Sequence, residues 1–176
     1  MRGSPHEHAL LAYRWLQCGD DRLWADFPRY WMAFNALYNA VREERDSEAT
    51  AVANVIRTFF DLLAAQACLD QIGHQCISEL IAIPPGDDRL DPNDPNYRKK
   101  TTVLVARFQG SGDPVERLAS LMAIVYQVRC NLVHGSKDPE VMRDQALVSS
   151  CTPIVEVVVA RLENIMEQHH NVPQPA

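Results

Sequence analysis

Apolar residues in the first half of the chain recur every three or four positions, which is the pattern of helices that bury one face. One helix is predicted to begin near Pro28 with Asp26 as its cap, because proline suits a first helical turn and disfavours an interior. A second is predicted to follow an N-cap at Ser47 and to run towards Ile72, with an interruption at Gly73. The two apolar stripes are Trp31, Phe34, Tyr38 and Val41, and then Val52, Val55, Ile56, Phe59, Phe60 and Leu63.

Shorter helices are predicted over residues 9–17 and 75–83. Between the second of these and the remainder of the chain, residues 84–96 carry four prolines, Gly86 and a run of aspartates. This composition favours turns and an exposed loop. The Pro/Asp-rich loop therefore divides the chain into two helical halves.

In the second half, residues 98–108 include Thr101, Thr102, Val103 and Val105, which favour a strand locally. The helical surroundings offer no strand partner, so we predict a helix there. Residues 113–116, Asp-Pro-Val-Glu, combine an N-cap, a first-turn proline and a capping-box glutamate. The helix that begins there is predicted to run to His134 and to stop at Gly135.

A last long helix is predicted after residues 138–140, Asp-Pro-Glu, by the same capping argument, with a bend near Pro153 and a frayed tail beyond His169. Its inward positions are Leu147, Val148, Ile154, Val155, Val158, Leu162, Ile165 and Met166. Amphipathic helices joined by short turns hide their apolar stripes against each other. Residues 1–176 are thus predicted to form one all-α domain, an antiparallel bundle of four main helices plus short ones.

Composition narrows the class of protein. No stretch approaches the roughly 20 uninterrupted apolar residues of a membrane-spanning helix, and the first residues lack the apolar run of a secretory signal. We therefore expect a cytoplasmic protein without a membrane partner.

Five widely spaced cysteines indicate reduced thiols, and the histidines lack the spacing of a zinc site. No metal or other cofactor is expected; the cysteines are Cys18, Cys68, Cys76, Cys130 and Cys151.

The formal net charge of -6 opposes nonspecific binding to polyanions, so any nucleic acid must meet a local basic site. Arg98, Lys99 and Lys100, beside Tyr97 and with Arg107 further along the chain, are the candidate RNA-binding residues, although a solvated cluster after an acidic loop is the favoured interpretation.

The candidate chemistry lies at the end of the helix before Gly135, where Arg129, Asn131 and His134 fall within six positions. Arginine can hold a phosphoryl oxygen through paired donors, histidine can exchange a proton near neutral pH, and asparagine can orient a hydroxyl or phosphate. On an ideal helix Arg129 and His134 lie about 140° apart, so they do not share a face. The side chains of Arg129 and His134 could act on one phosphate only if the helix unwinds at Gly135, or if a two-fold dimer brings in the same segment of a second subunit.

The Arg-x-x-x-x-His-Gly pattern of residues 129–135, at the end of one helix and before another long one, resembles the signature of the HEPN superfamily. The aromatic segment over residues 31–39 is similar to a helix of some uncharacterised members. The resemblance implies a helical bundle that dimerises and cleaves RNA without metal, often in toxin-antitoxin, phage-defence or RNA-processing systems. It implies that Arg129 stabilises the phosphorane and that His134 acts as general acid or base.

In that mechanism the ribose 2'-hydroxyl attacks the neighbouring phosphate and a 2',3'-cyclic phosphate is formed. The family usually has a polar residue after the arginine, where this chain has Cys130, and Asn131 comes one position later. This departure leaves the third catalytic role open, and some relatives bind rather than cut.

Three functions follow as alternatives. The first is a metal-independent endoribonuclease, a toxin or defence effector that forms a homodimer and meets an antitoxin or another regulatory protein. The second is a noncatalytic HEPN-like module that binds a nucleotide, RNA or a protein partner. The third is a structural dimerisation domain, in which Arg129 forms an ordinary ion pair and His134 interacts with the end of its helix.

Overall fold

The computed structural model describes residues 22–82, 84–134 and 137–170, and these residues contain only helices as regular elements. The predicted helix over residues 9–17, the stop at Gly135 and the tail from residue 171 lie outside them. The helices are α2 (Arg22–Asn39), α3 (Glu48–Phe59), α4 (Leu62–Ile72), α5 (His74–Ala82), α6 (Lys99–Gly110), α7 (Pro114–Val133) and α8 (Met142–His170).

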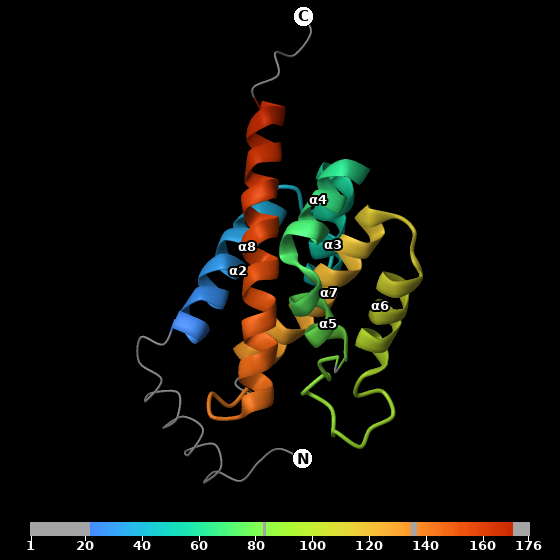
Figure 1. The fold of residues 1–176 in the computed structure, drawn as a ribbon, viewed down its shortest axis with the longest axis vertical. Coiled ribbons are helices and arrows are strands. Elements are labelled where there is room, and N and C mark those ends of the chain that lie inside the picture. The colour runs from blue at the N-terminus through green and yellow to red at the C-terminus, as the bar shows by residue number, and fades with distance from the viewer. Residues whose placement is uncertain (1–21, 83, 135–136, 171–176) are drawn as a thin grey trace, which may run out of the picture.

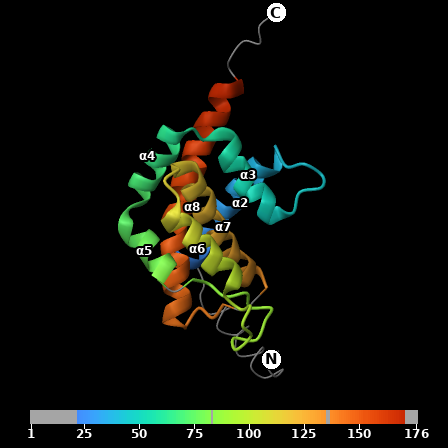
Figure 2. The same cartoon turned by 90° about the vertical axis from the view of Figure 1, so that its right-hand side faces the viewer.

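Helix α7 lies in the middle of the bundle (Figure 1). The longest helix, α8, runs beside α2, while α3 and α4 pack on α7. Helix α6 covers another side of α7, as the turned view shows (Figure 2), and it is reached from α5 through the Pro/Asp-rich loop. The prediction of an all-α bundle is confirmed.

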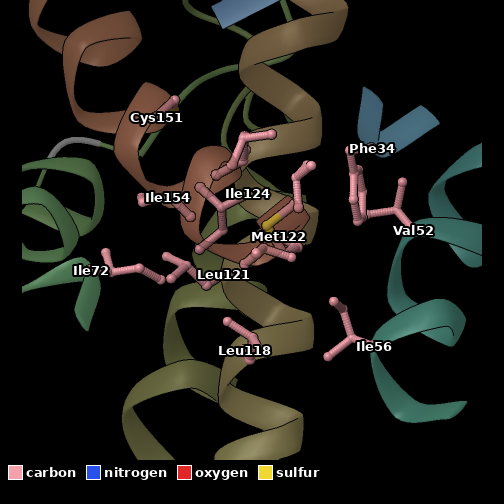
Figure 3. Packing of buried hydrophobic residues seen from close by; sticks show 14 of the residues in the cluster. Phe34, Val52, Ile56, Ile72, Leu118, Leu121, Met122, Ile124, Cys151 and Ile154 are labelled. Carbon is pink, nitrogen blue, oxygen red and sulfur yellow. The ribbon is translucent and has the colours of Figure 1, made fainter. Parts of the chain in front are cut away.

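The core is one cluster built around α7. Figure 3 shows Leu118, Leu121 and Met122 of α7 between side chains of α2 and α3 and side chains of α4 and α8. Burial of such side chains stabilises a fold by about 1.5–3 kcal/mol each. Further members of this fully buried set are Phe34, Val52, Ile56, Ile124 and Ile154.

The predicted start of the first long helix is wrong. Helix α2 begins at Arg22 and includes Pro28, and Asp26 is not its cap but pairs with Arg29 at 3.1 Å. The extra turns bury Trp24 and Phe27, which are 7% and 0% exposed. Burial of two large aromatic side chains outweighs the single backbone hydrogen bond that proline removes.

The prediction of one helix from Ser47 to Ile72 is correct only at its ends. The Ser47 hydroxyl accepts a hydrogen bond from the Thr50 amide at 3.1 Å, and Gly73 has a φ of 82°. Between them the chain turns by 116° after Phe60, where Asp61 caps α4 by accepting from the Ala64 amide at 2.7 Å. Because of this corner, Leu63 is 82% exposed instead of buried.

The helix predicted over residues 98–108 is confirmed as α6, and α7 begins as predicted. Asp113 accepts a hydrogen bond from the Val115 amide at 2.8 Å, and Pro114 occupies the first turn. The predicted capping box is wrong, because the Glu116 carboxylate instead binds Arg57 of α3 at 2.6 and 2.9 Å. This pair fastens the start of α7 to α3.

Helix α8 begins later than predicted. Asp138 accepts from the Glu140 amide at 3.0 Å within a turn, the helix starts at Met142, and it continues through Pro153. By length and composition α8 could cross a membrane, and the bent α3–α4 pair passes the same test only as one broken span. Half of the most apolar window of α8 is buried in the bundle, and one such helix is weak evidence for a membrane span.

Candidate functional site: a basic groove beside helix α7

The Pro/Asp-rich loop is fastened to α7 by Asn131. This side chain is 2% exposed, and its amide nitrogen donates to the Gly86 carbonyl at 2.7 Å. Its oxygen accepts from the Gln127 side chain at 2.9 Å and from the Asp88 amide at 3.4 Å. The carboxamide predicted to orient a substrate is therefore engaged with the loop.

A second buried group holds the same loop from the other side. Lys137, 3% exposed, contacts Asp88 at 3.0 Å and Asp144 of α8 at 3.1 Å. The Tyr97 hydroxyl donates to Asp88 at 2.8 Å. A buried charge needs partners of this kind, because isolated charges are costly away from water. The loop thereby fixes where α6 begins.

Between α3, α6 and α7 lies a groove of about 730 Å³. Of the described residues, five basic side chains and one acidic side chain, Glu48, line it. Lys99, Lys100 and Arg107 belong to one side of α6 and fall at helical spacing. We call this the basic groove; its basic residues are Arg57, Arg89, Lys99, Lys100 and Arg107.

Two of the five cations have partners outside the groove lining. Arg57 binds Glu116, and Arg89 binds Asp87 with its Nε at 2.7 Å. The hydrogen bonds from these arginines lower the pKa of Glu116 and of Asp87 below their ordinary values. Within the described part of the chain, the ammonium groups of Lys99 and Lys100 and the guanidinium of Arg107 form no ion pair. These three charges give the groove its positive character.

Tyr126 and Cys130, one turn apart on α7, also line the groove. Burial raises the pKa of the Tyr126 phenol, and the hydrogen bond with Cys130 and the neighbouring Glu48 carboxylate raise it further. The phenol therefore remains a neutral hydrogen-bond donor at physiological pH. Its oxygen lies 3.3 Å from Glu48 Oε2.

Arg129 lies beside the groove rather than in its lining. Its Nη1 atom contacts the same Glu48 Oε2 atom at 3.3 Å, and its guanidinium lies 6.0 Å from the centre of the Trp31 ring. The Nε atom is buried and has no hydrogen-bond partner among the described residues. The Tyr38 hydroxyl donates to the other Glu48 oxygen at 2.6 Å. Glu48 thus stands between Arg129 and the groove.

His134 is exposed at the end of α7, where its backbone amide donates to the Cys130 carbonyl at 3.0 Å. At about 100° per residue, His134 shares the groove side of α7 with Gln127 and Cys130 and lies about 140° from Arg129. Asn131 faces the loop. On the helical wheel Arg129 lies on the opposite side of α7 from Asn131 and His134, which are about 60° apart.

Only some of the candidate RNA-binding residues line the basic groove. Lys99 and Lys100 line the basic groove, whereas Arg98 does not, and its guanidinium lies 5.9 Å from the centre of the Tyr97 ring. Arg107, grouped with this cluster from the sequence, does line the groove, but Arg57 and Arg89 were missed. Nothing local in the sequence connects Arg57 or Arg89 with the cluster.

Among the described residues, no group of three or more histidine, cysteine, aspartate or glutamate side chains is placed to hold a metal ion. No family model, curated protein or solved structure matches the chain.

Proposed function

We propose that the protein binds single-stranded RNA in the basic groove. The observation that carries this proposal is the convergence of five cationic side chains from α3, α6 and the Pro/Asp-rich loop on one groove, in a chain whose net charge is -6. Phosphate affinity grows with the number of Lys and Arg contacts, so a local cluster can overcome an unfavourable overall charge.

The groove is not uniformly charged, which favours a nucleic acid over a simple anion. Val103, 54% exposed, and Leu104 of α6 line it together with the ring of Tyr126 of α7. Apolar and aromatic surface beside cations suits a ligand whose phosphates alternate with bases. RNA is the choice of nucleic acid that the HEPN resemblance favours.

The test measures binding of a labelled single-stranded RNA in EDTA at several salt concentrations. Lys99→Gln, Lys100→Gln and Arg107→Gln are combined in one groove variant, because these three charges form no ion pair. A matched control combines Arg29→Gln, Arg45→Gln and Arg161→Gln, which are exposed outside the groove and change the net charge equally.

The groove variant is expected to bind at least about tenfold more weakly, and its salt dependence is expected to fall by about two units on the logarithmic plot, since each single-strand phosphate contact contributes about 0.7. The control is expected to retain most of the affinity. Equal losses in the two variants would show that overall charge, not the groove, governs binding.

A second candidate, cleavage of the bound RNA, is favoured by the position of His134. On a helical wheel this exposed imidazole lies about 40° from Cys130, one turn further along the chain, although it is not among the residues that line the groove. In the proposed step His134 removes the 2'-hydroxyl proton, the 2'-oxygen bonds to phosphorus, and the bond to the 5'-oxygen breaks as that oxygen gains a proton. A second copy of the chain in a homodimer would supply the facing Arg129.

RNA incubated with the protein in EDTA distinguishes cleavage from binding alone. Cleavage that ends in a 2',3'-cyclic phosphate and is lost in His134→Ala supports the endoribonuclease. The matched control is His74→Ala, because His74 is an exposed histidine on α5 away from the groove. RNA that is bound but left intact supports the noncatalytic module, and equal cleavage by both variants removes His134 from the mechanism.

A further inference from the structure

Glu48 is the carboxylate that lines the basic groove, and it collects hydrogen-bond donors from two helices. Its Oε1 atom accepts from Tyr38 at 2.6 Å, and its Oε2 atom lies 3.3 Å from both the Tyr126 hydroxyl and Arg129 Nη1. The side chain is 26% exposed. An anionic oxygen thus occupies the inner side of a groove that is otherwise cationic.

Arg129 is held incompletely by this carboxylate. Its ion pair with Glu48 is one contact of 3.3 Å, whereas Arg57 binds Glu116 through two nitrogens at 2.6 and 2.9 Å. In the part of the chain that the structure describes, the buried Nε atom of Arg129 has no hydrogen-bond partner. A guanidinium prefers to bind an anion through two parallel donors, so Arg129 has hydrogen-bonding capacity that Glu48 does not use.

A phosphate group offers the same kind of oxygen as a carboxylate, but with more acceptors. We infer that Glu48 is a positioning residue that occupies the place of a ligand phosphate, and that a phosphate entering the groove takes over its contacts with Tyr126 and Arg129. Arg129 then becomes a direct ligand of the phosphate. This inference rests on the proposed RNA binding. It adds that Glu48 determines when Arg129 can contact the bound phosphate.

The binding of a short single-stranded RNA is measured for the wild type, Glu48→Gln, Arg129→Gln and the double variant. Glu48→Gln is expected to raise affinity about tenfold when Arg129 is present and less than about twofold when it is replaced, because contacting residues couple in such a cycle. An equal gain in both backgrounds would mean that Glu48 only adds a repelling charge, and the inference would be wrong.

Glu116→Gln is the matched control. This substitution also removes the carboxylate partner of a groove arginine, Arg57, but Glu116 does not pair with Arg129. Its effect on affinity is expected to be the same with and without Arg129. Wild-type protein that does not bind RNA would refute the proposed function itself, whereas binding without coupling between Glu48 and Arg129 refutes this inference alone.

A measurement on the wild type avoids any loss of fold in Glu48→Gln. The side-chain Nε–H signal of Arg129, identified by its absence in Arg129→Lys, is followed by nuclear magnetic resonance as RNA is added. The signal is expected to shift and to exchange more slowly with water when the phosphate binds. An Arg129 signal that stays unchanged while RNA occupies the groove would overturn the inference.

Discussion

The aromatic ring of Tyr97 lies over Gly86 so closely that a Cβ atom at position 86 would overlap it. The Gly86 carbonyl accepts from Asn131, and the Tyr97 hydroxyl donates to Asp88. The two ends of the Pro/Asp-rich loop therefore meet at this contact, directly before α6 supplies Lys99 and Lys100 to the basic groove.

Gly86→Ala is expected to destabilise the protein by about 1–3 kcal/mol, because the added methyl group forces the Tyr97 ring from its position. Urea unfolding followed by circular dichroism measures this change. The cost is expected to be smaller in a Tyr97→Ala background, where the ring is absent. A Gly86→Ala protein as stable as the wild type would mean that the loop adapts without strain.

Asn131→Ala is expected to lower the free energy of unfolding by about 1–3 kcal/mol, since it leaves the Gly86 carbonyl and the Gln127 side chain without their buried partner. Chemical unfolding provides the measurement. Asn164→Ala is the control, because Asn164 is an exposed asparagine on α8 that bonds only its own helix. Unchanged stability with altered RNA cleavage would instead assign Asn131 to the substrate.

The Arg57–Glu116 pair predicts a pH dependence. The arginine lowers the pKa of the Glu116 carboxyl below its ordinary value of 4.5, so the pair stabilises the fold above that pH and the contribution disappears as pH falls through the lower, folded-state pKa. At pH 7 the wild type is expected to be more stable than Arg57→Gln by less than about 1 kcal/mol, because the pair is partly exposed, and this difference is expected to shrink as the pH is lowered stepwise below 4.5. A difference that stays constant over that acid range contradicts this origin.

Asp61→Ala is expected to cost about 1 kcal/mol, because it removes the side chain that caps α4 at the corner after α3. Thermal unfolding measures the loss. Asp70→Ala, which removes an exposed aspartate within the same helix that accepts only from Gln66, is expected to cost a few tenths of a kcal/mol. Equal effects would show that Asp61 contributes charge rather than a cap.

Much of the fold followed from short-range patterns. Ser47, Asp113 and Gly73 mark helix ends through their own backbone and side-chain chemistry, and each prediction was correct. The corner at Asp61 was not predicted, because Phe60 and Leu63 continue an apolar pattern whose helical spacing does not reveal a change of direction. Similarly, Pro28 was assigned by its local preference, although tertiary burial of Trp24 and Phe27 extends α2 through it.

The candidate site was less accessible to sequence reasoning. Lys99 and Lys100 could be singled out because they are adjacent, and they do line the groove. Arg57 comes from α3 and Arg89 from the loop, so only the packing of α3 and α6 on α7 brings them to the same place. The pairing of Arg129 with Glu48, 81 positions earlier in the chain, is likewise a product of the tertiary fold.

Helix α6 packs chiefly on α7, and its start is set by a loop that Asn131 and Lys137 hold in place. Helix α6, which forms one side of the groove, thus packs on the outside of the bundle rather than in its centre. Helix α6 still contributes the buried side chains of Phe108 and Thr101. A change in the length of the loop would therefore reshape the groove and also draw on the stability of the bundle.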